Sequence, residues 1–398
     1  MEKLNEIIKH AYSTVQLYQR IAEEKHINIK DVDIRDLPIV DKNMYLDCGM
    51  SVISSEYIGK YFQNKLIWSR TSGSTGKYGE VYWDEIEMRK SLFSLWCYRK
   101  KYYNILPSDK LCYFFSADVG EGDIYEKGAI KAFSKKCLYD GTLSEVYKKI
   151  LLFNPVWMLL QPSVAVLLCN LIEENSFSIP SSLRYIEFTG EYLENSVRER
   201  VYSIFKCIIA NQYGTKEVNS IAFECPQGNL HCMSDNVYIE ELDKGNGIKS
   251  LCVTTLQNRA MPLIRFDLGD RGRLLTSQKC SCGNHNNILV LEAGRNNDWI
   301  KLEDGTKIHS YAMIQIINAI NYEIAGGIIQ YQIVQKNYNY FTVFLVLEES
   351  GDKDSIVVTM VERLQSRFGE NIKFIIKILE EVLPDANTGK LACFICEV

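Results

Sequence analysis

Apolar side chains recur with two different spacings along the N-terminal half of the chain, and each spacing predicts its own kind of element. Helical spacing runs from Leu4 to Tyr18, and it returns over 84–103, 125–134, 142–153, 163–174 and 194–205. Short apolar runs between these stretches predict strands at 66–70, 111–115, 156–161, 184–190 and 206–214. Strands and helices that alternate on this scale are typical of parallel α/β layers.

The pattern changes at residue 235, where short β-type segments replace the alternation. They cover 236–242, 250–256, 272–276 and 288–294 and predict an antiparallel β subdomain. Beyond residue 294 the pattern predicts a β-turn-β unit, then helices and strands over 311–320, 328–335, 340–347, 354–368 and 372–378. This α+β unit of about 100 residues has a common size for one small domain. We therefore expect an α/β fold with a large domain at 1–294 and a small α+β domain at 295–398.

Composition excludes several classes of protein. The 398 residues are 46% hydrophobic and 24% charged, and the formal net charge is −5. That balance argues against a protein that coats nucleic acid or binds a membrane surface through basic residues. The N-terminus has no apolar signal region, and the longest apolar stretch, 155–168, is broken by Gln161 and Pro162. We therefore expect a cytoplasmic protein without a membrane partner, whose 13 cysteines are reduced thiols or metal ligands.

A loop of small and hydroxyl residues follows the first predicted strand. It contains Ser72, Gly73, Ser74, Thr75, Gly76 and Lys77. Small residues let successive backbone N–H groups and hydroxyls converge on phosphate oxygens, and the lysine adds a positive charge. The spacing of a Walker A loop is absent. A plain turn between strand and helix is the alternative interpretation.

Five later motifs also follow strands or lie at boundaries between patterns. They occupy 185–191, 211–217, 262–270, 294–301 and 384–390. Loops after parallel strands are where open α/β sheets build ligand sites. Tyr213 could stack on a flat ring, Glu217 could hold Mg²⁺, and Asp270 could bond ribose hydroxyls. Each motif is a weak signal when taken alone.

Taken in order, these motifs resemble the core motifs of the adenylate-forming superfamily, which includes acyl-CoA ligases, nonribosomal-peptide adenylation domains and luciferases. The TSGSTGK loop, the YGxxE element, the RxxxGD element, the GRxxD hinge and the late PxxxxGK lysine appear in the family's order. The resemblance covers nearly the whole chain. It is strongest to the phenylacetate–CoA ligase branch, which has a similar short N-terminus and a CxCG element after RxxxGD.

The resemblance implies a two-step reaction. A carboxylate attacks the α-phosphate of ATP, which gives an acyl-adenylate and pyrophosphate, and a thiol of CoA or of a carrier-protein phosphopantetheine then displaces AMP. The substrate implied is an aromatic acid. Lys390 would act in the first step, and the small domain would then rotate as a mobile lid. An amine or a cofactor as acceptor, and a nucleotide-binding scaffold without catalysis, are the alternatives. An acyl carrier protein and a second copy of the chain are further candidate partners, whereas nucleic acid is not.

The resemblance also assigns roles to single residues. Catalysis would rest on Lys390, Glu217 and Lys216, the last standing where the family has a hydroxyl residue and either contacting the α-phosphate or pointing outward. ATP and Mg²⁺ would be bound by the loop from Ser72 to Lys77 together with Gly190, Glu191, Tyr213, Gly214, Thr215, Asp270 and Arg295. The acid would enter a pocket that contains Phe115, Gly120, Phe188, Thr189, Gly190 and Tyr213.

Two short clusters of cysteine and histidine predict a structural zinc site apart from this chemistry. One contains Cys225, His231 and Cys232, and the other contains Cys280 and Cys282. Such soft ligands close a tetrahedral Zn²⁺ site, for which four suffice. We expect Cys225, His231, Cys280 and Cys282 to be the ligands, with Cys232 as the alternate. The alternative is a set of reduced thiols near turns. His10 belongs to no recognisable constellation, and no Ser/His/Asp or Cys/His nucleophile set is visible.

Overall fold

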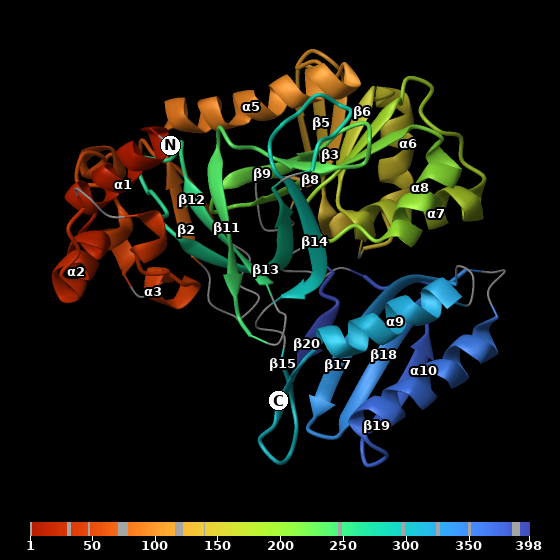
Figure 1. The fold of residues 1–398 in the computed structure, drawn as a ribbon. Coiled ribbons are helices and arrows are strands. Elements are labelled where there is room, and N and C mark those ends of the chain that lie inside the picture. The colour runs from red at the N-terminus through yellow and green to blue at the C-terminus, as the bar shows by residue number, and fades with distance from the viewer. Residues whose placement is uncertain are drawn as a thin grey trace. The chain divides into compact units, whose positions relative to one another are not determined.

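The computed structural model describes most of the chain. The described ranges are 2–29, 33–46, 48–70, 79–115, 122–138, 140–245, 249–276, 278–295, 299–323, 327–348, 352–383 and 391–398. They form two compact units: Met1–Leu106 with Ala210–Glu292, called unit 1, and Pro107–Ile209 with Ala293–Val398, called unit 2. Figure 1 labels most of their helices and strands. The domain boundary after residue 294 stays a prediction.

A largely antiparallel sheet is the centre of unit 1. Its strands are β8 (Ile208–Thr215, of which the part from Ala210 belongs here), β9 (Asn219–Glu224), β10 (Leu230–Cys232), β11 (Val237–Asp243), β12 (Lys249–Thr255), β13 (Phe266–Leu275) and β14 (Ile288–Arg295, of which the part up to Glu292 belongs here). They lie in the order β11-β12-β13-β14-β10-β9-β8. The pairs β11–β12, β12–β13, β14–β10, β10–β9 and β9–β8 are antiparallel. The change of pattern at residue 235 predicts this for β11, β12 and β13, whereas β8, β9 and β10 begin the antiparallel part earlier than the sequence indicated.

Helices from the N-terminal part of the chain pack around this sheet. The elements are α1 (Glu2–Thr14), α2 (Gln16–Lys25), α3 (Lys42–Leu46), α4 (Ile58–Phe62), the hairpin β1 (Ile67–Arg70) and β2 (Glu80–Trp83), and α5 (Glu85–Tyr103). The helix α5 begins where the Asp84 carboxylate accepts the N–H of Ile86 at 3.1 Å, and it ends at Asn104 in the left-handed conformation. Side chains of α1 and α2 share an apolar core with Ile221, Val237 and Val253 of the sheet.

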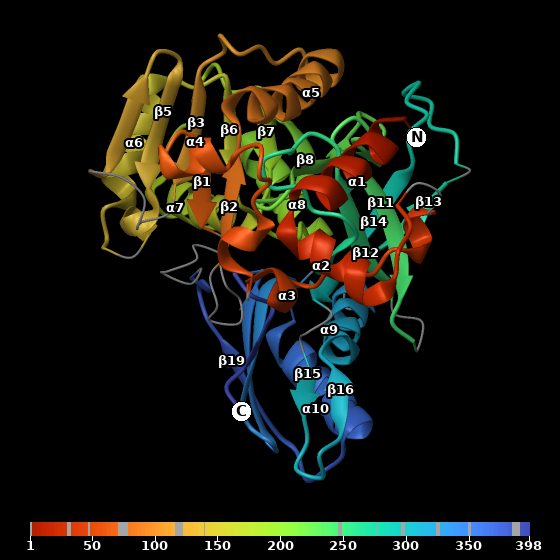
Figure 2. The same ribbon diagram turned by 90° about the vertical axis from the view of Figure 1, so that its left-hand side faces the viewer.

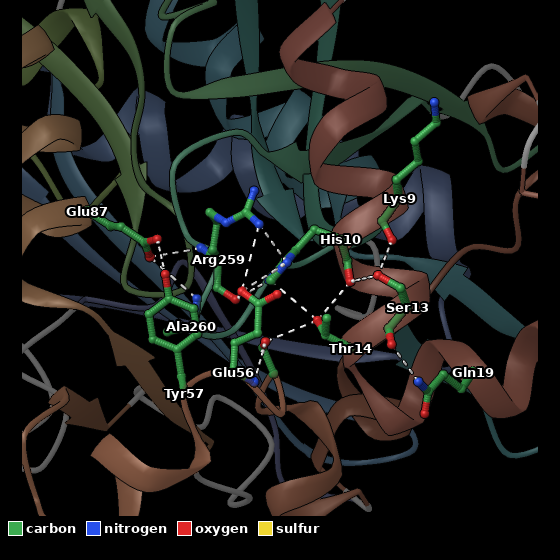
Figure 3. Close-up of polar contacts among 11 residues, drawn as sticks. Lys9, His10, Ser13, Thr14, Gln19, Glu56, Tyr57, Glu87, Arg259 and Ala260 are labelled. Atoms are coloured by element: carbon green, nitrogen blue, oxygen red, sulfur yellow. Dashed lines mark hydrogen bonds and ion pairs between the residues drawn. The ribbon is translucent and has the colours of Figure 1, made fainter.

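A buried polar network joins α1 and α5 to the segment before β13 (Figure 3). His10 is only 5% exposed; its Nε2 donates to the Arg259 carbonyl at 2.9 Å and its Nδ1 accepts from the Arg259 guanidinium at 2.9 Å. Glu87 accepts the backbone N–H of Arg259 at 2.9 Å and the hydroxyl of Tyr57 at 2.8 Å. His10 therefore belongs to a structural constellation that no sequence motif indicates, because its partners lie far away in the chain.

Parallel α/β layers form the first part of unit 2. The elements are β3 (Leu111–Phe115), β4 (Ile124–Lys127), β5 (Ile130–Ser134), α6 (Leu143–Phe153), β6 (Trp157–Leu160), α7 (Pro162–Asn175), β7 (Tyr185–Phe188) and α8 (Asn195–Phe205). The strand order is β7-β6-β3-β5-β4, parallel throughout except for the antiparallel edge strand β4. The strand β7 is buried at all four positions, as expected for a sheet covered on both faces.

One sequence expectation is wrong in this region. The helix predicted over 125–134 is the hairpin of β4 and β5, which turns at Gly128 with a φ of +58°. Its second strand pairs in parallel with β3 from Ile130 to Ser134, with the Phe133 ring fully buried. Tertiary pairing on a buried strand therefore outweighs the local helical spacing.

The C-terminal part of unit 2 has the α+β pattern that the sequence predicts. It comprises β15 (Trp299–Lys301), β16 (Lys307–His309), α9 (Tyr311–Glu323), β17 (Ile328–Asn337), β18 (Tyr340–Leu347), α10 (Lys353–Phe368), β19 (Lys373–Ile378) and β20 (Phe394–Cys396). Four strands lie in the order β19-β18-β17-β20, and α9 and α10 cover one face of that sheet (Figure 2). No described helix has both the length and the apolar character needed to cross a membrane.

Candidate nucleotide site and metal centre

Two of the predicted nucleotide-binding residues meet in unit 1. Tyr213 lies on β8 and Asp270 on β13, 57 residues apart, and the tyrosine hydroxyl donates to the carboxylate Oδ2 at 2.7 Å. Both side chains are half-buried. An aromatic ring whose hydroxyl orients a carboxylate presents a flat apolar face and a strong acceptor side by side. These are the groups that an adenine ring and ribose hydroxyls need.

The backbone beside Tyr213 has room for glycine only. A Cβ at Gly214 would lie 2.3 Å from the carbonyl oxygen of Asn219 and 2.7 Å from the Gln212 amide nitrogen. The register of β8 on β9 also shifts between Tyr213 and Gly214, so the strand is bulged at this point. Bulges re-aim the side chains that follow them, and this one lies at the start of the predicted Thr215–Glu217 segment.

The three residues after the bulge differ in their surroundings. The Thr215 hydroxyl is buried and has no hydrogen-bond partner among the described atoms, whereas Lys216 is exposed. The pKa of Tyr45 is raised well above its usual value. Burial is the largest cause, and the negative charge of the nearby Glu217 is the second. Sequence reasoning missed Tyr45. It lies on α3 and donates to the carbonyl of Glu80, at the start of β2.

The remaining predicted residues are placed less completely. Phe115 is half-buried at the end of β3, Phe188 is fully buried in the core of unit 2, and the Thr189 N–H donates to the Leu160 carbonyl at 3.0 Å. Gly190 has a φ of +85°, which favours glycine. Arg295 ends β14, and nothing is described of its side chain. The residues outside the described ranges are Gly120, Lys390 and the loop from Ser72 to Lys77.

The four predicted metal ligands converge in unit 1. The ligand atoms of Cys225, His231, Cys280 and Cys282 all lie within 4.8 Å of one another. The Cys225 and Cys280 sulfurs are 3.7 Å apart, and the Cys282 sulfur is 3.3 Å from His231 Nε2. Tetrahedral zinc with sulfur ligands at about 2.3 Å requires sulfurs about 3.8 Å apart. The residues present therefore fit a structural zinc ion.

Neighbouring groups orient His231 and favour the thiolate of Cys280, whereas burial raises the pKa of Cys225 to about 12. His231 Nδ1 donates to the Asn286 carbonyl at 3.1 Å, which leaves Nε2 with its lone pair facing the sulfurs. The Asn229 amide donates to the Cys280 sulfur at 3.3 Å. A backbone hydrogen bond from Cys282 is the largest of the effects that lower the pKa of Cys280 to about 6. The second shell of a metal site is thus present.

The alternate ligand Cys232 does not join this cluster. It follows His231 directly on β10, and neighbouring residues of a strand point to opposite faces of the sheet. Its side chain packs instead with Ala222, Leu251 and Leu289 in an apolar cluster. The alternation of side chains along β10 therefore shows that His231, and not Cys232, joins the cluster.

Comparisons with known proteins agree with this description. The family described as CapK C-terminal domain matches residues 300–397. Protein CapK of Staphylococcus aureus is 23% identical over 406 residues, covering 98% of this chain and 86% of the relative. A phenylacetate-coenzyme A ligase of Thermus thermophilus is 23% identical over 343 residues, covering 80% and 74%.

A solved structure of 2-hydroxyisobutyryl-CoA ligase in the postadenylation state, in complex with R3-HIB-AMP, aligns with a TM-score of 0.76 at 16% identity and covers all of this chain and 88% of that one. The chain has the fold of the CoA ligases. The α/β fold class and the resemblance to the adenylate-forming superfamily, with a phenylacetate–CoA ligase among the relatives, are confirmed. The thioesterification state of the same ligase aligns with a TM-score of 0.63 at 16% identity, covering 100% and 89%.

Proposed function

We propose that this protein is an AMP-forming ligase that activates a small carboxylic acid with ATP and transfers the acyl group to a thiol. The observation that carries the proposal is the Tyr213–Asp270 pair, in a chain with the CoA ligase fold. The tyrosine ring offers an apolar face to an adenine ring, and the oriented carboxylate can accept hydrogen bonds from ribose hydroxyls.

The chemistry that follows needs positioning and charge neutralisation more than covalent help. A carboxylate oxygen forms a bond to the α-phosphorus, and the bond to the bridging oxygen breaks, so that pyrophosphate leaves with the electron pair. Asp270 would hold the ribose and Tyr213 the adenine, which fixes the α-phosphate for in-line attack. Mg²⁺ held by Glu217 would neutralise phosphate charge. Lys390 would neutralise the two anions as they approach each other.

In the second step a thiol sulfur bonds to the acyl carbon, and the bond from that carbon to the AMP oxygen breaks. The resemblance favours an aromatic acid as substrate and CoA or a carrier-protein phosphopantetheine as acceptor. Zinc at the cluster of Cys225, His231, Cys280 and Cys282 would be structural, because all four tetrahedral positions have a protein ligand.

The test is pyrophosphate exchange that depends on a carboxylic acid. The wild-type protein is assayed with ATP, Mg²⁺ and a panel of aromatic and aliphatic acids, and at least one acid should support exchange. Lys390→Ala should lower the exchange rate by about a hundredfold or more, as loss of a group that acts on the transition state does. Lys353→Ala, which removes an exposed lysine from α10, is the matched control.

Undiminished exchange in Lys390→Ala would rule out the assigned role of that lysine. Tight ATP binding without exchange for any acid would favour the catalytically silent scaffold. Once an acid is identified, CoA, a phosphopantetheinylated carrier protein and an amine are each added to the preformed adenylate. The acceptor that releases AMP fastest identifies the second substrate.

A further inference from the structure

The carboxylate of Glu191 connects three segments of unit 2. Its Oε2 accepts the backbone N–H of Ser163 at 2.9 Å, and its Oε1 accepts the Ser163 hydroxyl at 2.8 Å. The same Oε1 accepts the backbone N–H of Leu391 at 3.0 Å, from a residue 200 positions further along the chain. Glu191 itself follows β7, directly after the left-handed turn at Gly190.

The surroundings of this carboxylate hold it in one place. Ser163 lies in the first turn of α7, where the helix dipole and the free N–H groups attract a negative charge. Burial raises the pKa of Glu191, while the hydrogen bonds from Ser163 and Leu391 and the nearby Lys135 oppose that rise. The side chain is therefore committed to protein donors, although the resemblance places Glu191 beside the nucleotide.

The Leu391 contact gives this arrangement a consequence for the reaction, because Leu391 follows Lys390 in the sequence. We propose that Glu191 is a positioning residue for the first half-reaction: it accepts the Leu391 N–H and so holds the chain at the position next to Lys390 while the adenylate forms. The inference rests on the proposed function. It assigns Glu191 no contact with substrate. The first turn of α7 fixes the carboxylate through the two hydrogen bonds from Ser163.

A second hydrogen bond also joins the segment after β7 to the C-terminal part of unit 2, but it does not involve a neighbour of Lys390. The Tyr331 hydroxyl, from β17, donates to Glu194 Oε1 at 3.2 Å, just before α8. Leu391 also packs against the apolar cluster built by α7 and α8. The Tyr331 contact joins the same parts of the chain but holds no residue next to Lys390. It provides the matched control that separates positioning of the lysine from general cohesion of the unit.

The first experiment measures hydrogen exchange at the Leu391 amide in the wild-type protein, Glu191→Ala, Glu191→Gln and Tyr331→Phe, without added substrate. Glu191→Ala should speed exchange of this amide about tenfold or more, because the amide loses its buried acceptor. Glu191→Gln keeps only one acceptor oxygen and turns the other position into a donor. The exchange rate of the Leu391 amide in this variant should therefore lie between the rates in the wild type and in Glu191→Ala. Tyr331→Phe should leave the Leu391 amide protected.

The second experiment separates the half-reactions with phenylacetate as the probe acid. Glu191→Ala should lower phenylacetate-dependent pyrophosphate exchange about tenfold to a hundredfold, the range for leaving a buried hydrogen-bonding group without its partner. Conversion of chemically prepared phenylacetyl-adenylate and CoA to the thioester should stay within about twofold of the wild type. Tyr331→Phe should change both half-reactions by the same factor.

An unchanged Leu391 amide in Glu191→Ala, or an equal loss in both half-reactions, would overturn the positioning role. If the wild type exchanges pyrophosphate with another acid of the panel, that acid replaces phenylacetate. Absence of exchange with every acid would refute the proposed function and with it the catalytic part of this inference. The amide measurement would still decide whether Glu191 holds Leu391.

Discussion

The Cys/His cluster and the Tyr213–Asp270 pair both belong to unit 1, yet they are built in opposite ways. In the cluster only His231 lies on a strand, β10, and the cysteines lie in the segments that follow β9 and β13, whereas Tyr213 and Asp270 lie on β8 and β13. In the cluster, Cys225 is 1% exposed and His231 fully buried, and the ligand atoms face one another. The pair is half-buried, and next to it are an unsatisfied hydroxyl at Thr215 and an exposed Lys216. A closed set of soft ligands suits an ion that stays, whereas a half-open set of polar groups suits a substrate that binds and leaves.

The largest expected effect comes from removing a ligand of the closed Cys/His cluster. Cys280→Ala should reduce bound zinc from about one ion per chain to nearly none and lower the free energy of unfolding by more than about 4 kcal/mol, as loss of a structural metal does. Metal analysis and denaturant unfolding measure the two quantities. Cys97→Ala, at an exposed cysteine of α5, should change neither. Wild-type protein without metal and of equal stability would contradict the zinc site.

The next effect breaks the half-open site. Asp270→Ala removes the carboxylate that would hold the ribose, and the KM for ATP should rise about tenfold to a hundredfold, since a charged hydrogen bond contributes about 1.5–3 kcal/mol. Zinc content should not change. Asp243→Ala removes an exposed carboxylate from β11 of the same sheet and is the control. An equal rise of KM in both variants would show that the effect is general charge, not ribose recognition.

Tyr213→Phe sharpens the comparison because it keeps the ring and removes only the hydroxyl that orients Asp270. The KM for ATP should rise about threefold to tenfold, the range for one neutral donor to a carboxylate whose ring contacts remain. Tyr238→Phe, a half-buried tyrosine of β11, should leave the KM unchanged. A loss as large as that of Asp270→Ala would mean that the hydroxyl itself contacts the nucleotide.

The smallest effect tests whether the two sites are independent. A chelator should lower the melting temperature of the wild-type protein, because zinc binds only the folded state. At a temperature where the metal-free chain remains folded, its affinity for ATP should change less than about twofold. Equilibrium binding of ATP with and without chelator measures this. A loss of affinity comparable to that of Asp270→Ala would place the metal in the nucleotide site.

Sequence patterns predicted most elements but failed where local and tertiary preferences disagree. The hairpin at 124–134 carries apolar residues at helical spacing, yet it folds as strands because β5 pairs with the buried β3. The network of His10, Arg259 and Glu87 was invisible for a different reason: its members lie on three separate segments and form no motif. Tyr45 was missed in the same way, since only folding brings it beside Glu217.

The amino-acid sequence by itself determined the alternation of strands and helices, the order of the motifs and the resemblance to the adenylate-forming superfamily. It also identified the candidate metal ligands, because CxC and nearby cysteine and histidine have little reason to occur in packing alone. Only the tertiary structure decided that His231 and not Cys232 faces the three cysteine sulfurs. The same is true of the hydrogen bonds from Tyr213 to Asp270 and from the Leu391 N–H to Glu191. Periodicity is a property of neighbours in the chain, whereas hydrogen bonds across 57 or 200 residues depend on which strand faces and helix ends the fold brings together.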